Sequence, residues 1–127
     1  MQFEKLDVWK RASRLACDIY KVTKGCKDYG FKDQLTRSAV SIPSNIAEGL
    51  ERGSANDESR FLYYAKGSAG ELVTQLYIGI EIGFIAKDEG LKLVAETKEV
   101  AAMIAALIKR RKGFVKGQGP NYDTGST

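Results

Sequence analysis

The residues of this sequence that could carry out chemistry are carboxylates and serines at helical spacing. Glu48, Glu71 and Glu81 are conceivable ligands of a two-metal site inside a helical bundle. Such sites use Glu-x-x-His motifs, and the chain contains no histidine, the commonest general base and a common zinc ligand. Cys17 and Cys26 lack metal-binding spacing and are interpreted as free thiols. The sequence therefore predicts no metal site.

Nucleophilic and phosphate-binding chemistry has equally little support. Ser38, Ser41 and Ser44 have no evident base beside them. The glycine-rich run at 67–70 lies within a helical pattern and lacks the strand and lysine of a phosphate-binding loop. We therefore expect no catalytic residue and no cofactor, and a protein that is not an enzyme.

The stretch 34–49 has the most informative pattern in the chain. At ~100° per residue, one side of a helix here is apolar and a neighbouring stripe is polar. The stripe comprises Gln34, Arg37, Ser38, Ser41, Asn45 and Glu48. A solvated face usually carries Lys and Glu, whereas short hydroxyls and amides suit a face packed against a partner. We assign Arg37, Ser41, Asn45 and Glu48 to an interface or structural role; the alternative is a polar groove that binds RNA or a ligand.

The elements that must position these residues are four amphipathic helices, predicted at 7–24, 31–50, 54–82 and 88–112. Asp7 is expected to cap the first helix, and Ser54 or Asn56 the third, where Asp57 and Glu58 suit the positive end of the helix dipole. Short connections imply antiparallel neighbours, so the fold class is all-α, an up-down-up-down four-helix bundle. Pro43 lies inside the second helix and is expected to kink it, because proline removes a backbone donor and crowds the preceding turn. The competing interpretation is two short helices with Pro43 at the first position of the second.

The length of 127 residues fits one domain, with the bundle at 1–112 and a flexible C-terminal tail at 113–127. The tail is rich in glycine and has no periodicity. No apolar run approaches the ~18 residues of a membrane span, and the first residues do not resemble a signal peptide. We expect a cytoplasmic protein that does not contact a membrane.

The hairpin between the second and third helices predicts two ion pairs. An antiparallel turn near Gly53 brings Arg37 towards Glu71 and Glu48 towards Arg60, either across the hairpin or across a subunit boundary. Gly67, Gly70 and Gly79 lie in the third helix, where each glycine costs ~1 kcal/mol relative to alanine. Close approach of a neighbouring backbone at these positions would explain that cost; otherwise it is simply tolerated.

Basic residues form two groups in a chain with a net charge of +4. The candidate nucleic-acid-binding residues are Lys10, Arg11, Arg14, Lys21 and Lys24 in the first helix and Lys109, Arg110, Arg111 and Lys112 at the end of the fourth. These ends lie close together in an up-down bundle, so the groups could merge. The alternative is a solvated face with charges that complement a helix dipole. Tyr20, Tyr63, Tyr64 and Tyr77 could stack bases, although tyrosines on bundle helices are more often core or interface residues.

Several motifs resemble the bacterial "four helix bundle protein" family, which includes proteins encoded by intervening sequences in large-subunit ribosomal RNA genes. The motifs are Leu6-Asp7-Val8-Trp9, Gln34-Leu35-Thr36-Arg37-Ser38, Ser41-Ile42-Pro43-Ser44-Asn45-Ile46-Ala47-Glu48-Gly49, Arg52, Ala65-Lys66-Gly67-Ser68 and Glu71-Leu72. The chain is also similar to the accessory protein of diversity-generating retroelements. The resemblance covers about residues 3–112.

The resemblance implies a small bundle that assembles into a ring of five subunits. For the retroelement relatives it implies binding of RNA and of a reverse transcriptase through basic surface. We therefore expect a homo-oligomer, a pentamer, that acts as a non-catalytic accessory factor for RNA or DNA. The alternative is an oligomeric protein-interaction scaffold without nucleic-acid affinity, whose partner is a reverse transcriptase or another protein.

Overall fold

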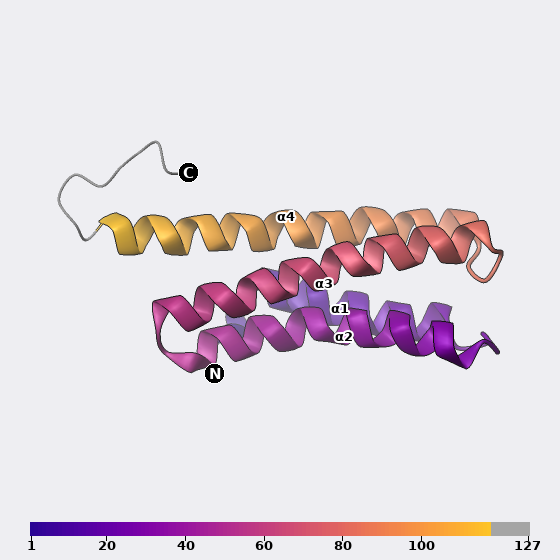
Figure 1. Cartoon of the computed structure of the whole chain (residues 1–127), viewed down its shortest axis with the longest axis horizontal. Helices are drawn as coiled ribbons and strands as arrows, with labels where there is room; N and C mark the ends of the chain where they lie inside the picture. The colour runs from indigo at the N-terminus through magenta and orange to yellow at the C-terminus, as the bar shows by residue number, and fades with distance from the viewer. Residues whose placement is uncertain (118–127) are drawn as a thin grey trace.

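The computed structural model describes residues 1–117, with side chains described for 1–112. A short 3-10 helix, η1 (Gln2–Lys5), precedes four α-helices: α1 (Asp7–Val22), α2 (Tyr29–Arg52), α3 (Ala55–Glu81) and α4 (Lys87–Gly117). Residues 1–117 contain no strand, so the predicted all-α class is confirmed. Figure 1 shows the helices stacked side by side along one long axis.

Contacts between helices define the topology of this four-helix bundle. Gly49 of α2 lies against Phe61 of α3. Ser41, which precedes Gly49 in α2, contacts Ser68, which follows Phe61 in α3. Residue numbers therefore decrease along α2 as they increase along α3, so the two helices are antiparallel. Figure 1 shows the same alternation for all four helices, with the chain reversing at each connection.

One apolar core runs through the bundle and takes residues from every helix. Its most deeply buried side chains include Leu15, Ile19, Leu35, Ile42, Ile46, Leu62, Leu72, Leu76, Val100 and Ile104. Together with the buried Ala39, Ala65 and Ala69 they recur at three- and four-residue steps, so each helix presents one apolar stripe inward. The opposite stripes are left to solvent and provide the candidate binding surfaces.

Pro43 is buried within an uninterrupted α2. The interpretation as a single helix is therefore correct, and the alternative of two short helices is wrong. The side chain of Asn45 donates to the Ser41 carbonyl oxygen over 2.9 Å, one turn before it. The bend expected at Pro43 stays a prediction.

The helix ends follow local capping chemistry. Ser54 Oγ accepts from the Asp57 amide over 3.1 Å, which confirms Ser54 as the cap of α3. Asp7 was expected to cap α1, but the cap position is Leu6, and Asp7 is the first helical residue. Asp28 caps α2 by accepting from the Phe31 amide over 3.0 Å, so this helix begins at Tyr29, before the predicted start.

At the other end of the chain, α4 continues to Gly117, five residues past its predicted end at Lys112. The rest of the predicted tail, 118–127, lies outside the described residues. None of the helices in the described part of the chain has an apolar stretch long enough to cross a membrane.

Candidate nucleic-acid interface

Four cationic side chains follow the solvent face of α1 and the turn after it. Lys10, Arg14, Lys21 and Lys24 are all exposed. Ala12, Leu15 and Ile19 on the opposite side of the same helix enter the core. The packing of this apolar side directs the four cationic side chains towards solvent. Among the described residues, no carboxylate lies within 4.0 Å of their charged atoms. We call these four residues the cationic stripe.

Arg11, predicted with that group, lies elsewhere. Its guanidinium donates from Nε and Nη2 to the two Glu96 carboxylate oxygens over 3.0 and 2.6 Å. This two-bond geometry joins α1 to α4 and raises the pKa of Arg11 through the hydrogen bond to Glu96. Because its charge is paired with Glu96, Arg11 links two helices, and its assignment as a phosphate-binding residue stays a prediction.

The basic residues at the end of α4 also differ in whether their charges have partners within the chain. Arg111 lies 3.4 Å from the Glu58 carboxylate, and Lys112 donates to the Tyr63 hydroxyl over 2.9 Å. Lys109 and Arg110 are exposed and make no ion pair among the described residues. Arg111 therefore has a paired charge, whereas Lys109, Arg110 and Lys112 have no carboxylate partner among the described residues.

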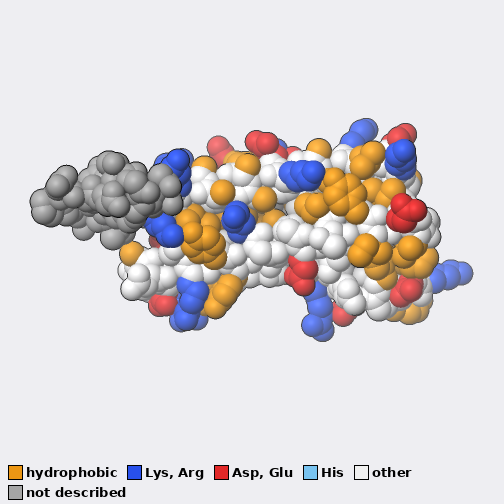
Figure 2. Space-filling view, turned by 45° about the horizontal axis from the view of Figure 1, so that its top comes forward, with side chains coloured by type: hydrophobic (Ala, Val, Ile, Leu, Met, Phe, Trp, Pro, Cys, Tyr) orange, Lys and Arg blue, Asp and Glu red, His pale blue; other side chains and the backbone are white. Residues whose placement is uncertain are grey.

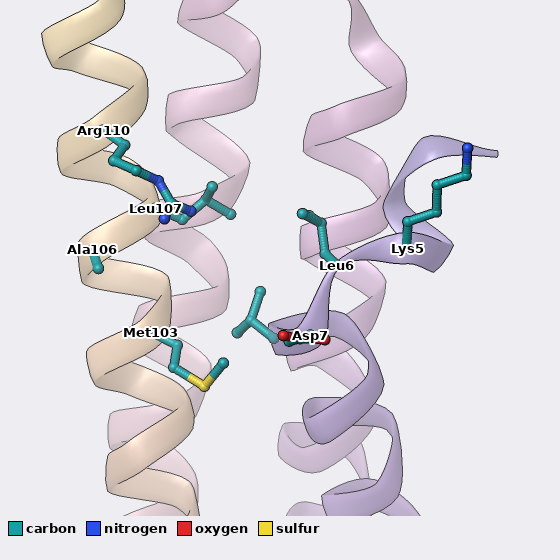
Figure 3. A pocket seen from close by; sticks show the side chains of 8 residues that line it. Lys5, Leu6, Asp7, Met103, Ala106, Leu107 and Arg110 are labelled. Atoms are coloured by element: carbon teal, nitrogen blue, oxygen red, sulfur yellow. The ribbon is translucent and has the colours of Figure 1, made fainter.

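A groove of about 340 Å³ lies between the second half of α4 and the residues at the start of α1. Figure 3 shows Arg110, Leu107 and Met103 on α4 facing Leu6 and Asp7, whereas Lys5 points away from the opening. The end of α4 therefore lies near the start of α1, as predicted, but no residue of the cationic stripe lines this groove. Asp7 lines the same groove, so it is not a purely cationic surface.

The polar stripe of α2 forms a second groove with α3. It encloses about 300 Å³ and is lined by Gln34, Arg37, Ser38, Ser41, Glu71 and Gln75. Its floor is hydrogen-bonded: the hydroxyls of Ser41 and Ser68 lie 2.8 Å apart, and Asn45 Nδ2 donates to Ser41 Oγ over 2.9 Å. The Gln75 Oε1 atom is buried and has no hydrogen-bond partner among the described residues. We call this surface the polar groove.

The charges around this groove pair locally, and the predicted cross-hairpin pairs do not form within the chain. Arg37 bonds Asp33 over 3.0 Å, one turn earlier. Glu48 binds Arg52 over 2.8 Å, and Arg60 binds Asp57 over 3.1 Å. An ion pair between residues one turn apart forms within a single helix and does not depend on the position of a second helix. These local pairs therefore form in place of the predicted pairs between α2 and α3. Glu71 receives only a long contact of 3.5 Å from Ser38 Oγ.

The glycines of α3 also differ from expectation. A Cβ added at Gly67 would have no atom within 4 Å, so the predicted close approach at that position is wrong within the chain. Gly79 of α3 does meet neighbouring side chains closely, since a Cβ there would lie 2.8 Å from Ile85 and 2.9 Å from Phe31. Contact with a neighbouring backbone is found at Gly49 of α2, where a Cβ would lie 3.1 Å from the Glu58 carbonyl oxygen and 3.1 Å from Phe61 Cβ. Sequence reasoning did not single out Gly49, because the only signal for it was its position within the helical pattern of α2.

The tyrosines considered for base stacking are on the surface. Tyr20, Tyr63, Tyr64 and Tyr77 have exposed fractions between 44% and 52%, so none is a core residue of the chain. Tyr63 is held by Lys112, and this hydrogen bond lowers the pKa of its hydroxyl. Tyr77 is held similarly, by Lys98 at 3.2 Å. Sequence reasoning missed Lys98, which has no basic neighbour to draw attention to it.

Metal chemistry finds no support in the described part of the chain. No three His, Cys, Asp or Glu side chains there are grouped so that they could hold a metal ion. Glu48 and Glu71, two of the carboxylates considered as ligands, are exposed and are bonded to Arg52 and Ser38, respectively.

Comparison with known proteins identifies relatives of this architecture. The model of the 23S rRNA-intervening sequence protein family matches residues 4–106. A solved structure of a protein of unknown function, from the S23 ribosomal protein family of Bacteroides thetaiotaomicron VPI-5482, has a TM-score of 0.77 and 24% identity. The match covers 80% of this chain and 98% of that one. No curated protein matches the chain.

Proposed function

Because the chain belongs to the 23S rRNA-intervening sequence protein family, we propose that it is a cytoplasmic, non-catalytic accessory factor that binds RNA as a homo-oligomer. The cationic stripe is the observation that carries this proposal. Its four side chains are exposed and lack a carboxylate partner among the described residues. Unpaired surface cations attract the phosphate backbone of a nucleic acid, and binding releases the counterions held there.

The stripe favours contacts to phosphate over contacts to bases. Lys10 and Lys21 lie about 16 Å apart along the helix at ~1.5 Å per residue. Three of its four residues are lysines, which are flexible point charges. The stripe has no amide or carboxylate side chain for base edges, and Arg14 is its single planar donor. We therefore propose binding that depends on the position of phosphates and little on sequence.

The polar groove supports self-association. Within the described residues the buried Gln75 Oε1 atom has no donor, and an unsatisfied buried acceptor costs about 1–3 kcal/mol. A donor from a neighbouring copy would remove that cost. We propose that this groove faces the next subunit of a ring, with five subunits as the family resemblance implies. Such a ring repeats the cationic stripe, so weak phosphate contacts add through multivalency.

The test is binding of a hairpin RNA, measured by fluorescence anisotropy at low salt, with the mass of the free protein measured by light scattering. The proposal predicts saturable binding by a protein with the mass of five chains. If an intact oligomer binds no RNA at low salt, the RNA-binding proposal is wrong. If the protein binds RNA as a monomer, only the proposed assembly is wrong.

A specific feature favours the alternative of a protein-interaction scaffold. Around the connection from α3 to α4, Ile78, Ile82 and Phe84 have exposed fractions of 47%, 52% and 42%. Figure 2 shows hydrophobic side chains gathered towards this end of the molecule. Exposed apolar side chains in one area suit a protein partner, such as a reverse transcriptase. Under this alternative, Ile82→Ser and Phe84→Ser would abolish partner binding and RNA would not bind.

A further inference from the structure

Two matching contacts join α3 to α4 on the surface of the bundle. Lys112 Nζ donates to the Tyr63 hydroxyl over 2.9 Å and lies 4.9 Å from the centre of its ring. Lys98 Nζ donates to the Tyr77 hydroxyl over 3.2 Å and lies 5.7 Å from its ring centre. The two tyrosines are about 21 Å apart along α3 at ~1.5 Å per residue. We call the surface between these pairs the tyrosine seam.

The floor of the tyrosine seam is made of small residues. Gly70 is exposed, and a Cβ added there would have no atom within 4 Å. Ala101 and Ala105 occupy the α4 side and are half-buried. The tyrosine rings therefore project at both ends above a low floor. Figure 2 shows this side of the molecule, with Lys and Arg side chains and pale surface across its middle and hydrophobic side chains towards both ends.

The charge of the tyrosine seam is positive. Lys66 lies close enough to Tyr63 to influence its hydroxyl electrostatically, and Lys109 is exposed one turn before Lys112. Between the two pairs, each helix has a single carboxylate: Glu71 on α3 and Glu99 on α4.

Both carboxylates belong to other surfaces. Glu71 contacts Ser38 of α2, and Glu99 acts electrostatically on Arg11 of α1. The surface between the tyrosines is thus left with lysines alone, which complements phosphate and disfavours a second copy of the same face.

We propose that the tyrosine seam binds a single-stranded segment of RNA, whose bases stack on Tyr63 and Tyr77 while the lysines contact its phosphates. This inference rests on the proposed RNA-binding function and adds the class of RNA that this surface takes. A lysine ammonium has three donors, so Lys98 and Lys112 can hold a phenol oxygen and a phosphate oxygen together. Unpaired bases expose the faces that stack on aromatic rings, whereas bases within a duplex do not.

The test compares an unstructured single-stranded RNA of about 12 nucleotides with an RNA duplex of the same length, both by fluorescence anisotropy. The variant Tyr63→Leu/Tyr77→Leu removes both rings. Its affinity for the single strand is expected to fall at least about tenfold, because each lost stack costs several-fold in binding. Its affinity for the duplex stays unchanged, since the cationic stripe does not depend on these rings.

Three control variants make the result specific. Tyr63→Phe/Tyr77→Phe keeps the rings and retains binding of the single strand to within about twofold. Tyr29→Leu removes another exposed tyrosine, at the start of α2, and has no effect. Gly70→Glu adds a carboxylate where a side chain meets open space, so it weakens single-strand binding without disturbing the fold, while Gly70→Ala, which adds no charge at the same place, does not.

The outcomes separate this inference from the proposed function. If neither RNA binds the wild-type protein, the RNA-binding function is wrong and the inference is wrong with it. If both RNAs bind and neither Tyr63→Leu/Tyr77→Leu nor Gly70→Glu weakens the single strand, only the tyrosine seam is wrong. If either variant changes the oligomeric mass, the seam is an interface between copies, which also overturns the inference.

Discussion

The face formed by α1 and the face formed by α2 and α3 satisfy their charges differently. On the first, Lys10 and Arg14 extend into solvent and have no carboxylate partner in the described part of the chain. On the second, Arg37 and Glu48 each bind a residue of opposite charge one turn away. The α1 face therefore keeps its attraction for an external anion, whereas the α2–α3 face has lost most of its own.

The two faces also differ in how firmly they are built. The α2–α3 face has a hydrogen-bonded floor, and its helices approach closely at Gly49. The α1 face consists of long side chains on one helix. This difference suggests a division of roles in which the rigid polar face recognises a neighbouring subunit and the flexible cationic face binds RNA.

The largest effect is expected from removing three cations of the stripe. The variant Lys10→Gln/Arg14→Gln/Lys21→Gln should lose affinity for a hairpin RNA on the order of a hundredfold. Each phosphate contact releases counterions from the RNA, and each lost contact removes that favourable contribution to binding. Anisotropy at a fixed low salt concentration measures the change. The unfolding midpoint should stay the same, since these side chains are exposed.

The matched control removes three exposed lysines outside the stripe. Its substitutions are Lys27→Gln, Lys87→Gln and Lys92→Gln. Both variants lose the same number of charges, so a general electrostatic effect would weaken them equally. Equal loss of affinity would contradict the difference between the two faces.

The next effect concerns the rigidity of the α2–α3 face. Gly49→Ala should lower the free energy of unfolding by about 1–3 kcal/mol, because the new Cβ would lie 3.1 Å from the Glu58 carbonyl oxygen on the backbone of α3. Gly67→Ala is the matched variant in open space, and it should raise stability by up to about 1 kcal/mol. Urea denaturation measures both. Stabilisation by both substitutions would show that α2 and α3 are not tightly packed at Gly49.

These glycines show where sequence reasoning reaches its limit. Apolar spacing predicted the four helices, and Ser54 with Asp57 predicted the start of α3, because both signals are local. Gly49 and Gly67 both lie in helical patterns, and only the distance between helices distinguishes them. That distance depends on how side chains of two elements interlock, which no local pattern records.

The same limit explains the errors in the candidate sites. Arg37 has carboxylates available at Asp33 and Glu71, and the choice depends on rotamers and on the exact register of the hairpin. The pairs of Tyr63 with Lys112 and Tyr77 with Lys98 need the register of α3 against α4, which sequence spacing does not define. The stripe on α1 was predictable because it follows from the periodicity of one helix.

A smaller effect, on self-association, should come from Gln75, whose Oε1 atom is an unpaired acceptor in the polar groove among the described residues. If Gln75 Oε1 meets a donor of the next subunit, Gln75→Leu leaves that donor unpaired and weakens association by about 1–3 kcal/mol. Analytical ultracentrifugation over a range of concentrations measures it, with Gln34→Leu, at the exposed edge of the groove, as the control. A more stable fold with unchanged association would mean that the groove is not an interface.

The smallest effect is expected at Arg37. Its side chain is 81% exposed and its partner Asp33 is 62% exposed, so the pair contributes less than about 1 kcal/mol. Arg37→Gln should therefore change neither the unfolding midpoint nor RNA affinity appreciably. A large loss of oligomeric mass in this variant would instead indicate that Arg37 meets a carboxylate of a neighbouring subunit, as the sequence suggested for Glu71.

The most direct test of the account is the salt dependence of hairpin RNA binding by the wild-type protein and by Lys10→Gln/Arg14→Gln/Lys21→Gln. Plots of the logarithm of affinity against the logarithm of salt concentration count the phosphates that each protein neutralises. The account predicts a steep slope for the wild type and a slope shallower by roughly 3 per bound chain for the variant. Equal slopes for the two proteins would contradict it, because RNA would then be held by residues outside the cationic stripe.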